Sequence, residues 1–332
     1  MLVGGNWEDS GGLLPEKGVA IITDDNVFHL YGGKFPQFPV FSVTPGEESK
    51  KLKVVEHLAE QLLDTGIDRS GFILAVGGGV VCDITGFLAS IYMRGIRCGY
   101  ISTTLLSQVD ASTGGKNGVN LGNTKNMIGT ITQPEFVVCD PVFLLTLSDR
   151  EFLSGLAELI KTAIIGDKYL FDLIEKSVDA IKNRDRELLT ELVAKSVRFK
   201  ALVVSEDERE TGVRRILNFG HTFGHAIEMY NLVNHGFAVA SGMELATWFS
   251  FSKGMISKAE RERIIALLKI FGLIEENNIP DDQIEHFILH DKKKTGSDIH
   301  FIFIEGIGKA VAEKIPVSEV IDFYKRYRLT NK

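Results

Sequence analysis

The sequence predicts a chain of two parts, a parallel α/β domain in residues 1–147 and a mostly α-helical domain in residues 148–332. Its length of 332 residues exceeds what a single hydrophobic core usually serves. In the first part, short apolar runs alternate with helical stretches, which favours a parallel sheet with helical crossovers. After residue 148 such runs nearly disappear and helical patterns replace them.

Five short apolar runs predict the strands of the first part. Polar or glycine-rich residues follow the runs, as in "FILAVGGG". Ligands bind beside the carboxyl ends of the strands in such sheets, so we expect a nucleotide-binding type of domain. Helical stretches such as 51–66 lie between the strands. The predicted strands are Val19–Thr23, Val40–Thr44, Phe72–Val76, Cys98–Thr104 and Phe136–Asp140.

The second part begins with a predicted helix. Ser148 and Glu151 have the spacing of a capping box, in which each side chain accepts a hydrogen bond from the other residue's backbone. Helical patterns continue to about Phe271. Near the end, "IHFIFIEGIGKAV" predicts a short hairpin, followed by a last helix.

Composition and charge exclude several classes of protein. Hydrophobic residues make up 44% and charged residues 24%, typical of a globular protein. The formal net charge of −7 argues against binding to nucleic acid or to an anionic membrane, although a local basic site for an anion remains compatible with it. Three cysteines imply no disulfide framework. No apolar stretch is long enough to span a bilayer and no signal peptide is apparent, so we expect a cytoplasmic protein.

The stretch "GGGVVCDITGF" follows the third predicted strand. Its glycines would let backbone N–H groups approach a phosphate at a helix N-terminus. A tight turn between strand and helix explains the same glycines. Asp83, in the first turn of the predicted helix, is either a cap or a ligand to a ribose or nicotinamide.

Residues 102–129 form a polar, glycine-rich segment that is too long for an ordinary connection, and we expect a long loop. Long ordered loops tend to be functional, and two lysines with an asparagine suit an anion site. A solvated loop with incidental charges is the alternative. The polar side chains that could act here are Thr103, Thr104, Asp110, Lys116, Lys125 and Asn126.

Three histidines and an acid are candidate metal ligands. His221 and His225 are four residues apart and share a helix face, and His235 follows ten residues later. Glu158, three residues before Lys161 in an apolar helix, could supply a carboxylate. Two histidines and one glutamate are a known catalytic zinc set. The spacing leaves open which of His221 and His225 would bind, and each histidine alone could be structural.

Basic residues near the histidines suit an anionic substrate. Arg214 and Asn218 lead into the histidine helix, and Lys200 precedes them. Lys292 and Lys293 belong to a lysine run that solvated charge also explains.

Taken together, these motifs resemble those of 3-dehydroquinate synthase, in the wider group of sugar phosphate cyclases. The match rests on "GGGVVCDITGFLASIYMRGI", "TTLLSQVDASTGGKNGVN", "KNMIG", "GLAELIKTAII" and "LNFGHTFGHAIE", and it runs from about Asp24 to the last helix. The resemblance implies an α/β domain that binds NAD, a helical domain that binds a divalent metal, zinc or cobalt, and a homodimer.

The implied reaction converts a seven-carbon sugar acid phosphate, 3-deoxy-D-arabino-heptulosonate 7-phosphate (DAHP), to 3-dehydroquinate plus phosphate, a step of the shikimate pathway. It proceeds by transient oxidation with NAD, phosphate elimination, re-reduction and intramolecular aldol closure. The substrate carries a carboxylate and a phosphate, so a basic site inside an acidic protein is electrostatically complementary to it.

The resemblance also implies roles for individual residues. The metal ligands would be Glu158, His221 and His235, with His225 facing the substrate or supporting the ligands. The residues around the reacting carbons and the nicotinamide would be Asp110, Lys116, Lys125, Asn126 and Lys161. The remaining NAD contacts would be Asp24, Glu47, Lys50, Gly78, Gly79, Asp83, Thr103, Thr104 and the segment from Phe143 to Thr146. The substrate's anionic groups would be held by Arg94, Lys200, Arg214, Asn218 and one of Lys292 or Lys293.

Four positions depart from the family's usual pattern. Phe237 replaces a glutamate two residues after His235, which could alter metal affinity or pocket shape. Cys82 and Thr124 replace glycines, and Lys294 replaces an asparagine. Three alternatives to the synthase are a paralogous cyclase acting on another sugar phosphate, a metal- and NAD-dependent polyol dehydrogenase, and a non-catalytic binding protein. Lys200, Arg214 and Asn218 favour a carboxylated substrate.

Overall fold

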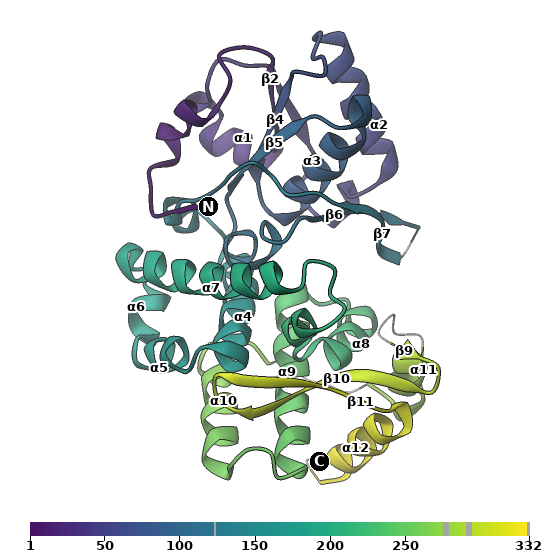
Figure 1. The fold of residues 1–332 in the computed structure, drawn as a ribbon. Coiled ribbons are helices and arrows are strands. Elements are labelled where there is room, and N and C mark those ends of the chain that lie inside the picture. Colours follow the sequence, from purple (N-terminus) through teal and green to yellow (C-terminus); the bar gives the residue numbers. More distant parts are fainter. Residues whose placement is uncertain (123, 275–278, 290–293, 331–332) are drawn as a thin grey trace. The chain divides into compact units, whose positions relative to one another are not determined.

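The computed structural model describes residues 1–122, 124–274, 279–289 and 294–330. The chain divides into two compact units (Figure 1). Unit 1 comprises Met1–Phe152 and Arg184–Val197, and unit 2 comprises Leu153–Asn183 and Arg198–Lys332. Two borders fall within helices α4 (Asp149–Gly166) and α7 (Arg186–Glu206), and the third, between residues 183 and 184, lies between α6 (Val178–Lys182) and α7. The domain border after residue 147 stays a prediction.

A six-stranded parallel sheet forms the centre of unit 1, with strand order β1-β8-β5-β4-β2-β3. All six residues of β4 are buried, as expected for a parallel strand covered on both faces. The predicted parallel sheet is confirmed, and only the edge strand β1 was not foreseen. The strands are β1 (Leu2–Val3), β2 (Val19–Asp24), β3 (Val40–Val43), β4 (Phe72–Gly77), β5 (Arg97–Ser102) and β8 (Val137–Cys139).

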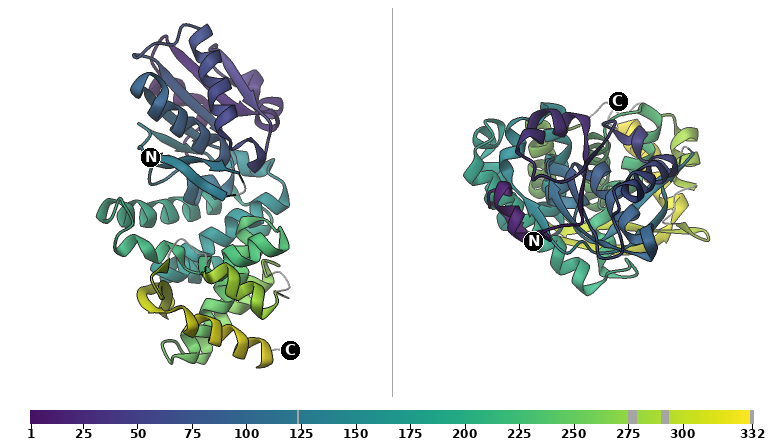
Figure 2. Two further views of the ribbon diagram at one scale, coloured as in Figure 1. Left: turned by 90° about the vertical axis from the view of Figure 1, so that its right-hand side faces the viewer. Right: turned by 90° about the horizontal axis from the view of Figure 1, so that it is seen from above.

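The helices of unit 1 cover both faces of this sheet. The chain leaves β2 through α1 to reach β3 on one side, and it leaves β4 through α3 to reach β5 on the other. Right-handed crossovers in opposite directions place α1 on one face and α2 and α3 on the other (Figures 1 and 2). The neighbouring strands β2 and β4 therefore flank a topological switch point, where such sheets bind ligands. The helices are α1 (Asp25–Tyr31), α2 (Leu52–Asp64) and α3 (Gly79–Ile91).

The polar segment that we expected to be a long loop is largely regular structure. It contains a π-helical turn, η5 (Ser107–Ala111), and an antiparallel pair, β6 (Lys116–Leu121) and β7 (Thr124–Ile131). Gly118 faces Gly129 across this pair, and a Cβ on Gly129 would lie 2.3 Å from the Asn117 carbonyl oxygen. Glycine disfavours strands by composition, but here it allows the backbones to approach closely, so the prediction of a loop was wrong.

Short helical turns complete unit 1. Asp140 caps the last of them, accepting hydrogen bonds from the backbone N–H groups of Val142 and Trp7. The turns are η1 (Trp7–Leu13), η2 (Gly32–Lys34), η3 (Glu47–Ser49), η4 (Tyr92–Arg94) and η6 (Pro141–Leu145).

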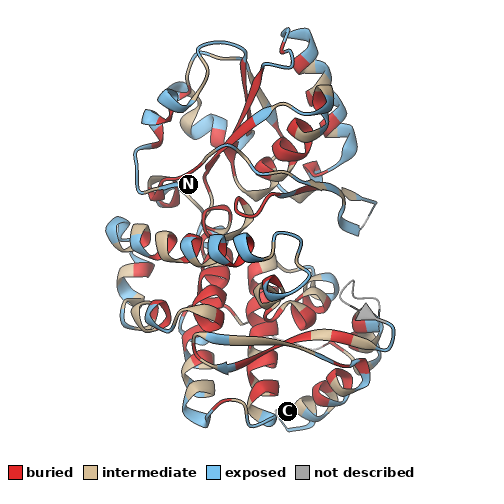
Figure 3. Cartoon of the chain, viewed as in Figure 1, coloured by how far each residue is buried: buried red, intermediate tan, exposed pale blue. Residues whose placement is uncertain are grey.

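Unit 2 is mostly helical, as predicted. The backbone N–H of Glu151 donates to Ser148 Oγ at 3.3 Å, so Ser148 caps α4. Helix α9 is buried along most of its length and forms the centre of this unit (Figure 3). Besides parts of α4 and α7, the helical elements of this unit are α5 (Lys168–Lys176), α6 (Val178–Lys182), η7 (Val213–Asn218), α8 (His221–Asn231), α9 (His235–Ser252), α10 (Lys258–Ile270), α11 (Asp281–Leu289) and α12 (Val317–Thr330).

The predicted C-terminal hairpin is present as β10 (Asp298–Gly306) and β11 (Lys309–Pro316), with the short β9 (Lys294–Thr295) beside β10. Phe301 and Phe303 of β10 pack against Phe249 of α9, and their ring centroids are 5.2 and 5.0 Å from that ring. Among the described residues, no helix is long and apolar enough to cross a membrane.

The three cysteines of unit 1 should resist thiol reagents. Burial raises the pKa of Cys98 to about 11 and that of Cys139 to about 12, and it also raises the pKa of Cys82. The reactive thiolate is therefore scarce at pH 8, and the sulfur atoms are covered. We expect labelling by a chromogenic disulfide to be at least about tenfold slower in the native protein than in denaturant, where three thiols should react. Fast labelling of any one thiol in the native protein would contradict its burial.

Candidate active site

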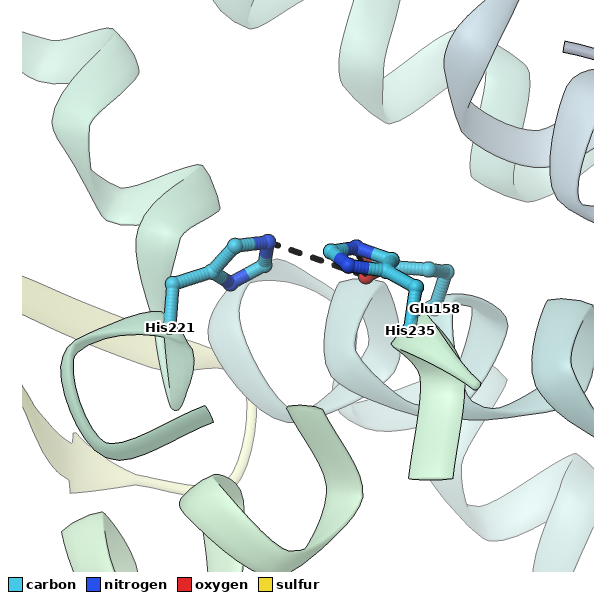
Figure 4. A group of neighbouring side chains, drawn as sticks. All are labelled: Glu158, His221 and His235. Carbon is cyan, nitrogen blue, oxygen red and sulfur yellow. Dashed lines mark ion pairs between the residues drawn. The ribbon is translucent and has the colours of Figure 1, made fainter. Parts of the chain in front are cut away.

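Three side chains of unit 2 converge from three helices: Glu158 of α4, and His221 and His235, the first residues of α8 and α9 (Figure 4). Nε2 of His235 lies 3.4 Å from Glu158 Oε1, and Nε2 of His221 lies 3.8 Å from the same oxygen. One ligand atom from each residue lies within 4.8 Å of the others. Two imidazole nitrogens and one carboxylate are the donor set of a catalytic zinc site with an open position.

The other ring nitrogen of each histidine, Nδ1, contacts a hydrogen-bond acceptor. His221 Nδ1 lies 3.2 Å from the Phe219 carbonyl oxygen, and His235 Nδ1 lies 3.1 Å from Glu228 Oε2. Both acceptors fix a proton on Nδ1, which orients Nε2 toward Glu158 as a donor atom for a metal. Metal-binding histidines are usually held in this way.

Glu158 is a buried carboxylate that the described protein groups satisfy only in part. Its side chain is 1% exposed, and neither oxygen has a hydrogen bond of normal geometry among the described residues. Its partners are ion-pair contacts with Lys161, itself 2% exposed, and with the two histidines. Burial raises the pKa of Glu158, but the charges of Lys161 and His235 outweigh burial and lower it to about 2. An ionised, incompletely bonded carboxylate beside two imidazoles fits a divalent cation.

Two carboxylates favour the protonated form of His235 when no metal is bound. Burial lowers its pKa, but contacts with Glu158 and Glu228 outweigh burial and raise it to about 10. The proton on Nε2 faces Glu158, so a metal that binds this nitrogen must displace that proton.

The structure places His225 beside this group rather than in it. Its ring centroid lies 5.4 Å from that of His221, with the ring planes at 87°. Of the two histidines that the helix spacing left open, the geometry favours His221 as the candidate ligand. Sequence reasoning missed Glu228, which lies seven residues after His221 and shares the α8 face with His221 and His225. Phe237, where the family pattern usually has a glutamate, is buried.

Two of the predicted anion-binding residues of unit 2, Arg214 and Asn218, form hydrogen bonds with their neighbours. Arg214 is 2% exposed, and its Nη1 donates to the Glu208 carbonyl oxygen at 2.5 Å. Its backbone N–H donates to Asp207 Oδ2 at 3.1 Å, which anchors η7. Asn218, at the end of η7, donates to Glu210. Lys200 of α7 is buried, whereas Lys292 and Lys293 lie outside the described residues.

The predicted NAD residues of unit 1 gather at the switch point of its sheet. Thr23 pairs with Val76, and Gly77 pairs with Ser102. Asp24, Gly78 and Thr103 therefore lie side by side at the carboxyl ends of three neighbouring strands. A Cβ on Gly78 would lie 2.8 Å from the Thr104 methyl carbon, so a side chain at this turn would displace Thr104. Gly79 begins α3 directly after it. This arrangement of strand ends and a helix N-terminus suits a dinucleotide.

A second group of the predicted NAD residues is tied together by charge. Lys50 is 4% exposed and forms an ion pair with Asp83 on α3. Glu47 Oε1 accepts a hydrogen bond from Asn120 Nδ2 at 2.8 Å, and the Asn120 backbone N–H donates to the Lys50 carbonyl oxygen. These contacts hold the segment after β3 against α3 and β6.

The remaining predicted residues of unit 1 are more scattered. Phe143 is 1% exposed and packs on Tyr31 and Trp7, so a cofactor contact there would involve its backbone, whereas Thr146 hydrogen-bonds Tyr31 at the surface. The others occupy η5, the β6–β7 pair and η4. They are the half-buried Asp110 and the exposed Lys116, Lys125, Asn126 and Arg94.

Comparison with known proteins shows the family of the chain. Its residues 40–154 match the 3-dehydroquinate synthase N-terminal family, and residues 155–294 match the 3-dehydroquinate synthase C-terminal family. The chain belongs to the 3-dehydroquinate synthase family. A 3-dehydroquinate synthase from Sulfurovum sp. (strain NBC37-1) is 44% identical over 321 residues, which cover 93% of this chain and 90% of the relative.

Two solved structures of related cyclases share the family fold. ValA, a 2-epi-5-epi-valiolone synthase from Streptomyces hygroscopicus subsp. jinggangensis with NAD+ and Zn2+ bound, superimposes with a TM-score of 0.90 at 27% identity, covering 99% of this chain and 96% of that one. A 2-deoxy-scyllo-inosose synthase with carbaglucose-6-phosphate, NAD+ and Co2+ gives 0.87 at 25% identity, covering 98% and 95%.

Proposed function

We propose that this chain is a 3-dehydroquinate synthase, which converts DAHP to 3-dehydroquinate and inorganic phosphate. The observation that carries the proposal is the convergence of Glu158, His221 and His235 next to the buried Lys161, in a chain of this family. The overall reaction eliminates phosphate and closes a carbocycle without net oxidation, so the enzyme is a carbon–oxygen lyase.

The two cofactors would be held by different units. Glu158, His221 and His235 would bind zinc or cobalt, and Asp24, Gly78 and their neighbours at the sheet edge would bind NAD. When bound, the metal supplies a Lewis acid and NAD supplies a reversible hydride acceptor.

The protein's own groups supply orientation and charge. Arg214 and Lys200 are buried cations in unit 2, and charge-assisted donors of this kind suit the substrate's carboxylate and phosphate. The Lys161 ammonium, fixed by Glu158, would stabilise negative charge that develops on a substrate oxygen. His225, whose ring adjoins His221, would face the substrate.

A paralogous cyclase is the alternative that the structural comparison supports, because both solved relatives are named as synthases of other compounds. Arg214, Lys200 and Asn218 favour the carboxylated substrate. Phe237, Cys82 and Thr124 are where this chain departs from the usual pattern, and a changed pocket would involve them first.

The deciding experiment measures phosphate release from DAHP by purified protein with NAD and zinc or cobalt. We expect phosphate and 3-dehydroquinate in equal amounts and no steady rise in absorbance near 340 nm, because the reaction has no net redox change. No release from DAHP, but release from another sugar phosphate, would indicate a paralogous cyclase. Accumulating NADH would indicate a polyol dehydrogenase.

The assembly of the enzyme is proposed from the resemblance, and its location from the sequence. We propose a cytoplasmic homodimer. Size-exclusion chromatography with light scattering should give about twice the chain mass of 36.7 kDa, and a mass near that of one chain would contradict the dimer.

A further inference from the structure

Glu228 lies at hydrogen-bond distance from His235, with 3.1 Å between Oε2 of Glu228 and Nδ1 of His235. Its side chain is 11% exposed, so water screens this contact weakly. The opposite histidine has a different partner, since His221 Nδ1 faces a neutral backbone carbonyl. Unlike this carbonyl, Glu228 carries a charge, and its carboxylate can be changed by substitution.

The close packing of α8 on α9 sets this contact. A Cβ on Gly242 of α9 would lie 2.0 Å from the Gly220 carbonyl oxygen, and one on Gly224 of α8 would lie 3.1 Å from the Ala238 carbonyl oxygen. The two helices therefore meet backbone to backbone. This approach lets a glutamate on α8 reach the first residue of α9.

The charges of the site explain how a second carboxylate would favour the binding of a dication. Glu158 already has a buried cationic partner in Lys161, and these two charges sum to zero. With neutral histidines, a bound dication would leave this buried group with two positive charges. A buried net charge is costly, and a nearby carboxylate offsets part of that cost.

We propose that Glu228 is the positioning residue of the metal centre. Glu228 fixes His235 for metal binding, and it supplies a negative charge to a site in which the positive charge of Lys161 offsets that of Glu158. This inference rests on the proposed function only in that it assumes a divalent metal at Glu158, His221 and His235. The hydrogen bond orients the imidazole, and the charge raises the affinity of the site for a dication. Losing an outer partner of this kind typically costs 10–100-fold in metal affinity.

The test compares Glu228→Gln and Glu228→Ala with the unmodified full-length protein in titrations with cobalt, followed by zinc competition against a chelator. Glutamine keeps an oxygen that can accept the Nδ1–H bond but removes the charge, and alanine removes both. We expect affinity to fall about tenfold in Glu228→Gln and toward 100-fold in Glu228→Ala. The visible absorption of bound cobalt should also change in Glu228→Ala, because His235 is no longer held.

Two control variants separate this role from general effects of mutation. Met229→Ala changes the adjacent, 61% exposed residue of α8, and Glu262→Gln removes an exposed carboxylate of α10. Both should bind cobalt as the unmodified protein does. Unchanged affinity and an unchanged cobalt spectrum in both Glu228 variants would overturn the inference while leaving the metal centre intact. Failure of the unmodified protein to bind either metal would instead overturn the metal centre itself.

Discussion

Replacing Glu158 with alanine is expected to abolish stoichiometric zinc or cobalt binding and to reduce phosphate release by more than 100-fold. Glu158 is the only carboxylate among the three proposed ligands, and its loss should exceed the roughly 10–100-fold effect of losing an outer partner. His221→Ala and His235→Ala should act in the same direction. Metal content by atomic emission and phosphate release, measured on the same preparations, check this. Stoichiometric metal in the triple variant would exclude the assignment.

Replacing Glu158 with glutamine should destabilise the metal-free protein, because it removes the carboxylate that forms an ion pair with the buried Lys161. Both side chains of the pair are at most 2% exposed. Breaking such a pair by removing one partner costs about 3–5 kcal/mol, whereas replacing both partners with uncharged groups costs much less. Denaturant unfolding should therefore show Glu158→Gln/Lys161→Met to be more stable than Glu158→Gln alone.

The control for this comparison is Glu262 on α10, whose side chain is 56% exposed and forms ion pairs with Lys258 and Arg261 at the surface. Solvent screens such pairs, so Glu262→Ala should change stability little. If Glu158→Gln were as stable as Glu262→Ala, the described ion pair would not be buried in solution.

The parallel sheet could be predicted because its signal is local. Strands buried on both faces consist of short apolar runs, and β2 and β4 begin at the predicted residues, Val19 and Phe72. The hairpin β6–β7 lacks this signal. It depends on Gly118 and Gly129 facing each other, and a pairing across strands is not visible in composition.

The site could be predicted only in part for a related reason. Helical spacing shows that His221, His225 and Glu228 share a face of α8, but it does not show what that face meets. His235 reaches Glu158 because α9 turns back along α8, and the glycines at the contact set how close the two helices come. The family resemblance named His221 as a ligand. The structure adds Glu228, which the spacing alone gave no reason to select.

Replacing Arg214 with alanine is expected to weaken substrate binding and to leave NAD binding unchanged. Arg214 is a buried cation whose guanidinium is held by the Glu208 carbonyl oxygen and whose backbone is held by Asp207. A preorganised guanidinium binds a carboxylate or phosphate through charge-assisted hydrogen bonds worth about 1.5–3 kcal/mol. We therefore expect kcat/KM to fall by roughly 10–100-fold, mainly through KM.

Steady-state kinetics and a separate NAD titration measure the two effects. Arg215→Ala is the matched control, because Arg215 belongs to the same turn but contacts His300, with 3.1 Å between Nη1 and Nε2. Arg214→Lys keeps the charge and should recover part of the loss, although lysine lacks the planar donor pair. Equal loss of NAD and substrate binding in Arg214→Ala would show a folding defect rather than a substrate contact. Selective loss in Arg214→Ala together with partial recovery in Arg214→Lys would assign the guanidinium to an anionic group of the substrate, since a purely structural role predicts no difference between the two ligands.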